Sequence, residues 1–133
     1  FKNKKIITVY GPGILQYESP SQRAISKYAF LLFLKLNDLL NKKNICGFNF
    51  AVRKSAYEKS EKFDTSLSMA EDVILGLSLK KQGKILLDTS LEVYVSPRRF
   101  KKSSIKTFST YAKSYIQTLW LHQKPKNHFE DIR

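Results

Sequence analysis

The chain has 133 residues, of which 42% are apolar and 26% charged, a composition typical of one globular domain. This excludes collagen-like repeats and extended disorder, and the length excludes a large two-domain enzyme. Lysine and arginine total 24 against 11 aspartate and glutamate, so the formal charge is +13. Such an excess indicates an anionic partner: nucleic acid, a phosphate-bearing ligand or a membrane surface. A single cysteine, Cys46, excludes an internal disulfide and fits a reducing compartment.

Neither a signal peptide nor a membrane-spanning segment is predicted. The chain begins with Phe1 rather than Met, and the lysines that follow precede only a short apolar run. The longest nearly uncharged stretch, residues 26–40, contains two lysines and an aspartate and is shorter than the ~20 apolar residues that cross a bilayer. We therefore expect a soluble or peripherally bound piece of a longer chain.

The first half of the chain predicts a strand, a helix and a second strand. β-Branched residues at 6–10 end at a Gly-Pro-Gly sequence, 11–13, which predicts a short strand and a turn. A Ser-Pro pair and apolar residues at helical spacing predict a helix from Pro20 to about Asn41. Because this helix is apolar nearly all round, we expect it to be deeply buried or packed on an apolar partner. Residues 45–52 alternate and predict the second strand.

The middle of the chain predicts a capped helix. Residues 54–65 are polar and read as a loop. Ser68 and Glu71 then have the spacing of a capping box, in which the serine caps the helix and the glutamate is its third residue. The helix is expected to continue to Gln82 and to end at Gly83, the residue type preferred just after a helix.

The last part predicts two short strands and an amphipathic helix. The strands are expected at 84–88 and 91–95, and the helix, rich in aromatic residues, at 103–121. Residues 97–126 carry eight lysines and arginines and no acid. This charge beside an aromatic helix is typical of a helix that lies on a membrane surface, so an anionic membrane is one predicted partner. We therefore expect a cytoplasmic chain, peripheral at the inner face of the membrane.

The most specific pattern lies between residues 47 and 100. Its first part is a G-x-N-x-A-x-R sequence, followed by Phe-Asp at 63–64 and Glu-Asp at 71–72. Its second part is Gly83 after the predicted helix and a basic pair at 98–99. The order and spacing of these sequences resemble the acceptor half of family-two glycosyltransferases, which have the GT-A fold.

This resemblance implies an α/β fold. Residues 1–100 would form the acceptor-side, C-terminal portion of a GT-A catalytic domain, and residues 101–133 a basic amphipathic helix and tail. The implied reaction is the inverting transfer of a sugar from a nucleotide-sugar to a hydroxyl acceptor, which is lipid-linked or part of a polysaccharide.

The resemblance also implies parts outside this chain. The complete enzyme is expected to use a divalent metal, Mg²⁺ or Mn²⁺, held by a D-x-D motif in a donor-binding half. No D-x-D occurs in this sequence, so no metal ligand is assigned to it. We therefore expect the isolated chain to be inactive, and to self-associate through strands that the missing half would cover.

By the same resemblance, Asp72 is the base that takes the acceptor proton as the hydroxyl attacks. A place in the first turn of a helix offers free amide donors and a positive dipole end, which would keep the carboxylate ionised. Gly76, one turn later, is expected to leave room for an acceptor. The alternative is structural, since acids are favoured in first turns, and Glu71 is already explained by the capping box.

Four further residues are candidates for binding the acceptor or donor: Glu71, Asn49, Arg98 and Arg99. The two arginines suit the phosphates of a departing nucleoside diphosphate, because guanidinium forks match phosphate oxygens. The alternative for them is a solvated or lipid-facing basic patch. Asn49 faces either the acceptor or a backbone partner. The histidine that many family members carry near the basic pair is missing, since both histidines lie far downstream.

A different class of function is a basic binding module without catalysis, held to a membrane or to nucleic acid. Aromatic residues of the last helix could stack on bases. Nucleic acid is disfavoured, however, because no RNP, KH or helix-turn-helix pattern accompanies the charge.

Overall fold

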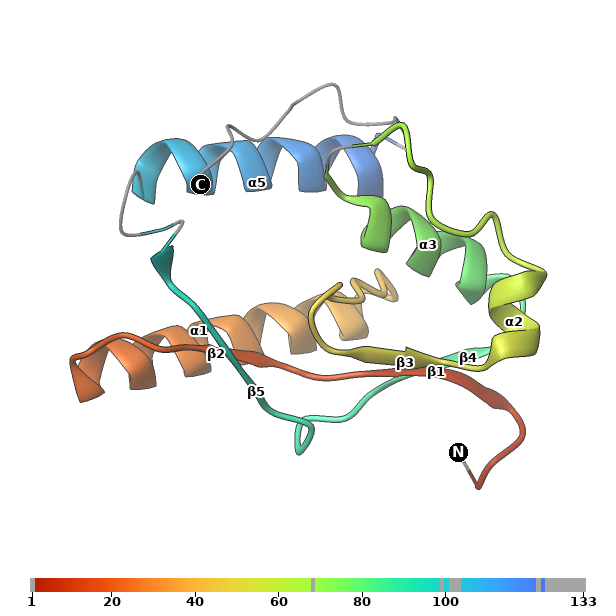
Figure 1. Ribbon diagram of the computed structural model, residues 1–133, viewed down its shortest axis with the longest axis horizontal. Coiled ribbons are helices and arrows are strands. Elements are labelled where there is room, and N and C mark those ends of the chain that lie inside the picture. The colour runs from red at the N-terminus through yellow and green to blue at the C-terminus, as the bar shows by residue number, and fades with distance from the viewer. Residues whose placement is uncertain (1, 68, 99, 101–103, 122, 124–133) are drawn as a thin grey trace.

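The structure is a computed structural model that describes residues 2–67, 69–98, 100, 104–121 and 123 (Figure 1). It is mixed α/β, as the sequence predicts, and its strands form two small sheets.

In the larger sheet, β1 (Ile6–Tyr10) lies between β3 (Phe50–Val52), which is antiparallel to it, and β4 (Lys84–Leu87), which is parallel. The second sheet is a parallel pair, β2 (Gly13–Leu15) and β5 (Val93–Val95). The central strand β1 therefore joins segments that are distant in the sequence.

Helices cover these sheets (Figure 1). They are α1 (Pro20–Leu39), the short α2 (Lys54–Glu58), α3 (Glu71–Lys80) and α5 (Ser104–Leu119). The helices predicted over 20–41 and 103–121 are confirmed, each to within two residues. Within the described part of the chain, none of the helices is both long and apolar enough to cross a bilayer.

The core is formed by one side of each large element. Tyr10 of β1, Leu34 of α1, and Leu75 and Leu79 of α3 are fully buried, together with Ile45 of the loop before β3. Burial of these side chains removes apolar surface from water, which is the main favourable term in folding. The position of α3 on the sheet is therefore fixed by its apolar side.

The predicted strand at 45–52 is mostly wrong. Only Phe50–Val52 pairs with β1, whereas Ile45 and Cys46 are buried in the core and the chain turns after them. The N–H of Asn49 donates to the carbonyl of Cys46 at 2.8 Å and closes this turn. In place of the alternation expected of a strand, the consecutive residues Ile45 and Cys46 are both buried and Gly47 and Phe48 are both exposed.

The predicted turn at 11–13 is also wrong. The chain continues in extended form from β1 into β2, and Gly11 and Pro12 are buried. A Cβ on Gly11 would lie 2.1 Å from the carbonyl oxygen of Leu91, so the glycine is needed for a close approach of two backbones. The side-chain N–H₂ of Asn49 donates to the carbonyls of Pro12 (3.1 Å) and Leu91 (2.6 Å). We call these four residues the crossing.

The predicted ends of α3 need correction. Glu71 is the first residue of α3 rather than the third, and the N-cap is Ala70 without a side-chain hydrogen bond. The capping box is therefore wrong, and Ser68 lies outside the described residues. At the other end, α3 stops at Lys80, and Gly83 does not adopt a positive φ. Its Cβ would instead lie 2.9 Å from Ile7 Cγ2, so it permits close packing against β1.

One stretch that reads as a loop contains structure that the sequence does not predict. The polar stretch at 54–65 includes the helix α2. Beyond it, Phe63 packs against Tyr57 and Phe50, with ring centroids 5.9 and 6.3 Å apart. These contacts anchor the loop that leads to α3.

The last helix, α5, is attached to the same core. Leu119 is fully buried, and the ring centroid of Tyr115 lies 5.3 Å from that of Phe33 of α1. Ser114 Oγ contacts Met69 Sδ at 2.9 Å, just before α3. Part of the apolar side of this helix therefore faces the domain rather than a membrane.

Substitution of Gly11 by alanine tests the crossing. Gly11→Ala is expected to lower the free energy of unfolding by about 2–3 kcal/mol, because its Cβ would meet a backbone oxygen that cannot rotate away. Gly47→Ala is the matched control. Its Cβ would meet only a side-chain oxygen, at 3.1 Å, and a smaller loss is expected. Urea unfolding compares the two, and equal stabilities would contradict the close approach.

Candidate active site

The carboxylate of Asp72 joins two distant segments. Asp72 is the second residue of α3, and its Oδ2 accepts a hydrogen bond from the N–H of Gly47 at 2.6 Å. Its Oδ1 accepts one from the N–H of Val73 at 2.8 Å. The G-x-N-x-A-x-R sequence and the Glu-Asp pair, which the sequence analysis places in one candidate site, therefore meet in the structure.

Gly47 is required for this contact. A Cβ at this position would lie 3.1 Å from Asp72 Oδ2 and 3.5 Å from Asp72 Cβ, so a side chain would crowd the carboxylate. The turn that Asn49 closes onto the carbonyl of Cys46 directs the Gly47 N–H at α3. The sequence identifies Gly47 only as part of a motif and does not predict that its N–H donates to Asp72.

Backbone strain lies directly before this site. Ala70, the N-cap of α3, has φ 60° and ψ 17°, in the left-handed region. A residue with a Cβ costs roughly 1–2 kcal/mol there. Strained residues persist where the surrounding structure holds them and are concentrated at functional sites. The strain supports a functional role for the start of α3.

Burial raises the pKa of Asp72 above the usual range of an aspartate. The hydrogen bonds from Gly47 and Val73 act in the opposite direction, and the charge of Glu71 adds to the increase. The start of a helix alone predicts an easily ionised carboxylate, but here the cost of removing the charge from water is larger. A carboxylate with a raised pKa accepts a proton more readily than an ordinary one, as a general base requires.

Gly76 does not leave room for an acceptor. Its Cβ would lie 3.1 Å from Ile45 Cγ1 and 3.2 Å from the carbonyl oxygen of Lys43. The space beside it is filled by the loop that precedes β3. The expectation from the sequence is wrong, because the glycine serves packing between α3 and this loop.

Asn49 and Cys46 have structural roles in this arrangement. The amide nitrogen of Asn49 holds the crossing, so of the two roles left open by the sequence the backbone one is observed. Cys46 is a buried free thiol, and burial together with the nearby Asp72 raises its pKa to about 12. A thiol with this pKa is a poor nucleophile, and Cys46 packs in the core.

The other candidate residues are not gathered around Asp72. Glu71 is adjacent to it and half-buried, whereas Arg98 is exposed. Figure 1 shows the carboxyl end of β5, which precedes Arg98, toward the end of the molecule where α5 begins, away from the start of α3. Arg99 lies outside the described residues.

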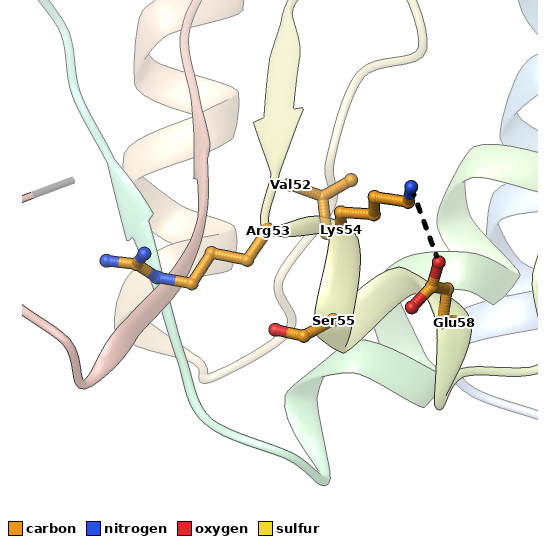
Figure 2. Close-up of a pocket in the computed structure, with 5 residues that line it drawn as sticks. All are labelled: Val52, Arg53, Lys54, Ser55 and Glu58. Atoms are coloured by element: carbon orange, nitrogen blue, oxygen red, sulfur yellow. Dashed lines mark ion pairs between the residues drawn. The ribbon is translucent and has the colours of Figure 1, made fainter.

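A pocket on the surface lies apart from the candidate site residues. It is open and lies where β3 meets α2, with Val52, Arg53, Lys54, Ser55 and Glu58 around it (Figure 2). Lys54 and Glu58 form an exposed ion pair, and the side chain of Arg53 points away from both. Arg53 Nε donates to the carbonyl of Ile6 at 2.8 Å and so fixes the start of β1. This pocket contains none of the candidate site residues.

The described residues do not fit a metal ion. Within those ranges, no three His, Cys, Asp or Glu side chains gather into a group that could hold one.

Comparisons of the chain with protein-family models, with curated proteins and with solved structures find no match. The resemblance to family-two glycosyltransferases therefore rests on the motifs in the sequence alone.

The stability of the chain should report the raised pKa of Asp72. Because the folded-state pKa lies above the unfolded-state value, the stabilising effect of protonated Asp72 is complete below the unfolded value. It is lost as the pH rises through the folded value. Asp72→Asn retains an oxygen acceptor for the Gly47 N–H and does not ionise.

We therefore compare the free energy of unfolding of Asp72→Asn with that of the parent chain at two pH values. The difference is expected to favour the variant more at neutral pH than in acid. Urea unfolding of both chains at about pH 3 and about pH 7 gives this difference. A variant whose relative stability is the same at both values, or greater in acid, would show that the pKa of Asp72 is not raised.

Proposed function

We propose that this chain is the acceptor-side portion of the catalytic domain of an inverting, family-two glycosyltransferase with the GT-A fold. The observation that supports this most is the hydrogen bond from Gly47 to Asp72, because it joins two of the motifs that carry the resemblance. The pairing of β1 with an antiparallel β3 and a parallel β4 gives these motifs a common scaffold.

In the proposed reaction, Asp72 is the general base. The O–H bond of the acceptor breaks as its proton passes to a carboxylate oxygen of Asp72, and the acceptor oxygen bonds to the anomeric carbon of the donor sugar. The bond from that carbon to the phosphate oxygen breaks, and the nucleoside diphosphate leaves with the electron pair. Attack from the opposite face inverts the configuration of the sugar.

Supporting parts of the proposed enzyme are the basic pair and a donor-binding half. Arg98 and Arg99 would meet the phosphates of the nucleotide-sugar, and Glu71 would lie near the acceptor, while Asn49 holds the crossing. A D-x-D motif outside this chain would hold Mg²⁺ or Mn²⁺. Residues of that half and the acceptor loops would determine which sugar, nucleotide and acceptor the enzyme uses.

Substitution of Asp72 in the enzyme that includes its donor-binding half tests the base. Asp72→Asn is expected to lower kcat about a hundredfold or more, because an amide cannot accept the proton. Glu71→Gln is the matched control, since it removes the adjacent carboxylate and leaves the contact with Gly47 in place. Thermal melting checks that both variants fold. Near-normal turnover of Asp72→Asn would exclude this base.

The isolated 133-residue chain should not bind a nucleotide-sugar. Calorimetry with Mn²⁺ and a panel of nucleotide-sugars is expected to show no heat of binding, because the proposed metal ligands lie outside the chain. Micromolar binding to the isolated chain would contradict its assignment to the acceptor side.

A further inference from the structure

The helix α1 has an apolar face that the domain leaves uncovered. Leu34 and Asn37 are its buried residues. On the opposite side, five large apolar side chains are exposed by 50–81%: Ile25, Tyr28, Leu32, Leu36 and Leu39. We call these five residues the outer face of α1. Of the two alternatives that the sequence leaves open for this helix, deep burial is wrong for the outer face, and packing on an apolar partner stays a prediction.

The outer face is a continuous row. Its residues are spaced by three or four positions, so at 3.6 residues per turn they lie on one side of the helix. With a rise of ~1.5 Å per residue, the row is about 20 Å long. Monomeric proteins seldom expose an apolar patch of this extent unless it binds something.

The acids near the outer face are paired with lysines, and one such pair joins Lys27 of α1 to Glu92 at 2.7 Å. Lys35 is exposed beside the row. Asp38, the acid within α1, is half-buried and forms an ion pair with Lys43. An anionic surface is therefore complementary to this face, whereas a second copy of a chain with a charge of +13 would be repelled.

The apolar surface continues beyond the end of α1. Leu40, Trp120 and Leu121 are each more than half exposed. Lys42 connects the two helices, since its Nζ donates to the carbonyl of Leu119 at 2.8 Å and lies 5.0 Å from the centre of the Trp120 ring. Tryptophan and lysine side chains prefer the boundary between lipid headgroups and acyl chains.

We propose that the chain binds an anionic lipid bilayer through the outer face of α1. The helix lies in the plane of the membrane, with its apolar row at the boundary between headgroups and acyl chains and with Trp120 at one end. The surface differs from the one expected from the sequence, which is α5, and it is independent of the proposed sugar transfer.

Sedimentation with lipid vesicles tests this proposal on the 133-residue chain. Vesicles of phosphatidylcholine with phosphatidylserine should bind the chain and shift the emission of Trp120 to the blue. Vesicles of phosphatidylcholine alone should bind it more weakly, and high salt should weaken the anionic case because it screens the charges. Failure to bind anionic vesicles would overturn the proposal.

Two double variants test whether the outer face of α1 is the surface that binds the vesicles. Leu32→Gln with Leu36→Gln should weaken binding to the anionic vesicles about tenfold or more, because two leucines no longer enter the apolar region. Leu91→Gln with Tyr94→Gln is the matched control, because it changes two exposed apolar side chains outside α1 and α5 and keeps the backbone carbonyl of Leu91 in the crossing. It should bind like the parent chain. Equal losses in both variants, or unchanged binding of the α1 variant, would overturn the proposal.

A charge variant gives a second test with little risk to folding, because the side chain is exposed. Lys35→Glu should weaken binding to anionic vesicles and leave binding to phosphatidylcholine unchanged. Analytical ultracentrifugation completes the set. A parent chain that is dimeric without lipid, and monomeric when Leu32 and Leu36 are changed, would assign the outer face to a second copy and overturn the membrane proposal.

Discussion

The crossing of Gly11, Pro12, Asn49 and Leu91 is the constraint on which the candidate site depends. Two backbones approach so closely there that only glycine fits, and the amide of Asn49 donates to the carbonyls of Pro12 and Leu91, the first of which also accepts from the N–H of Val93. Asn49 also closes the turn that directs the N–H of Gly47 at α3. Loss of the crossing would therefore release the loop that holds Asp72, although none of its four residues contacts that carboxylate.

The start of α3 contains two residues that cost the fold free energy where other residue types would cost less. Ala70 occupies a left-handed conformation that glycine would adopt at less cost, and Asp72 pays a desolvation penalty that asparagine would avoid. Both costs are in one segment, next to the contact with Gly47. In our proposal this segment is a site for proton transfer, and active sites retain strain and perturbed carboxylates that packing does not require.

The sequence predicts elements whose signal is local. Helical spacing at 20–41 and 103–121 and the β-branched run at 6–10 identify α1, α5 and β1, because each pattern repeats within one element. It fails where a distant segment decides the outcome. Gly76 and Gly83 look like an opening and a helix end, but they permit close packing against the loop before β3 and against β1. The motifs place Asp72 in a candidate site, yet its donor Gly47 is 25 residues away in the sequence.

The same limit explains which helix meets the membrane in our proposal. Periodicity shows that α1 is apolar on both sides and that α5 is amphipathic, but it does not show which side the domain covers. In the structure, Leu119 of α5 turns inward and the outer face of α1 remains exposed. The contact of Ser114 with Met69 places the second half of α5 near the start of α3 (Figure 1). Leu34, on the other side of α1, packs in the same core as Leu75 of α3, so in our proposal α1 lies between the bilayer and the helix that carries Asp72.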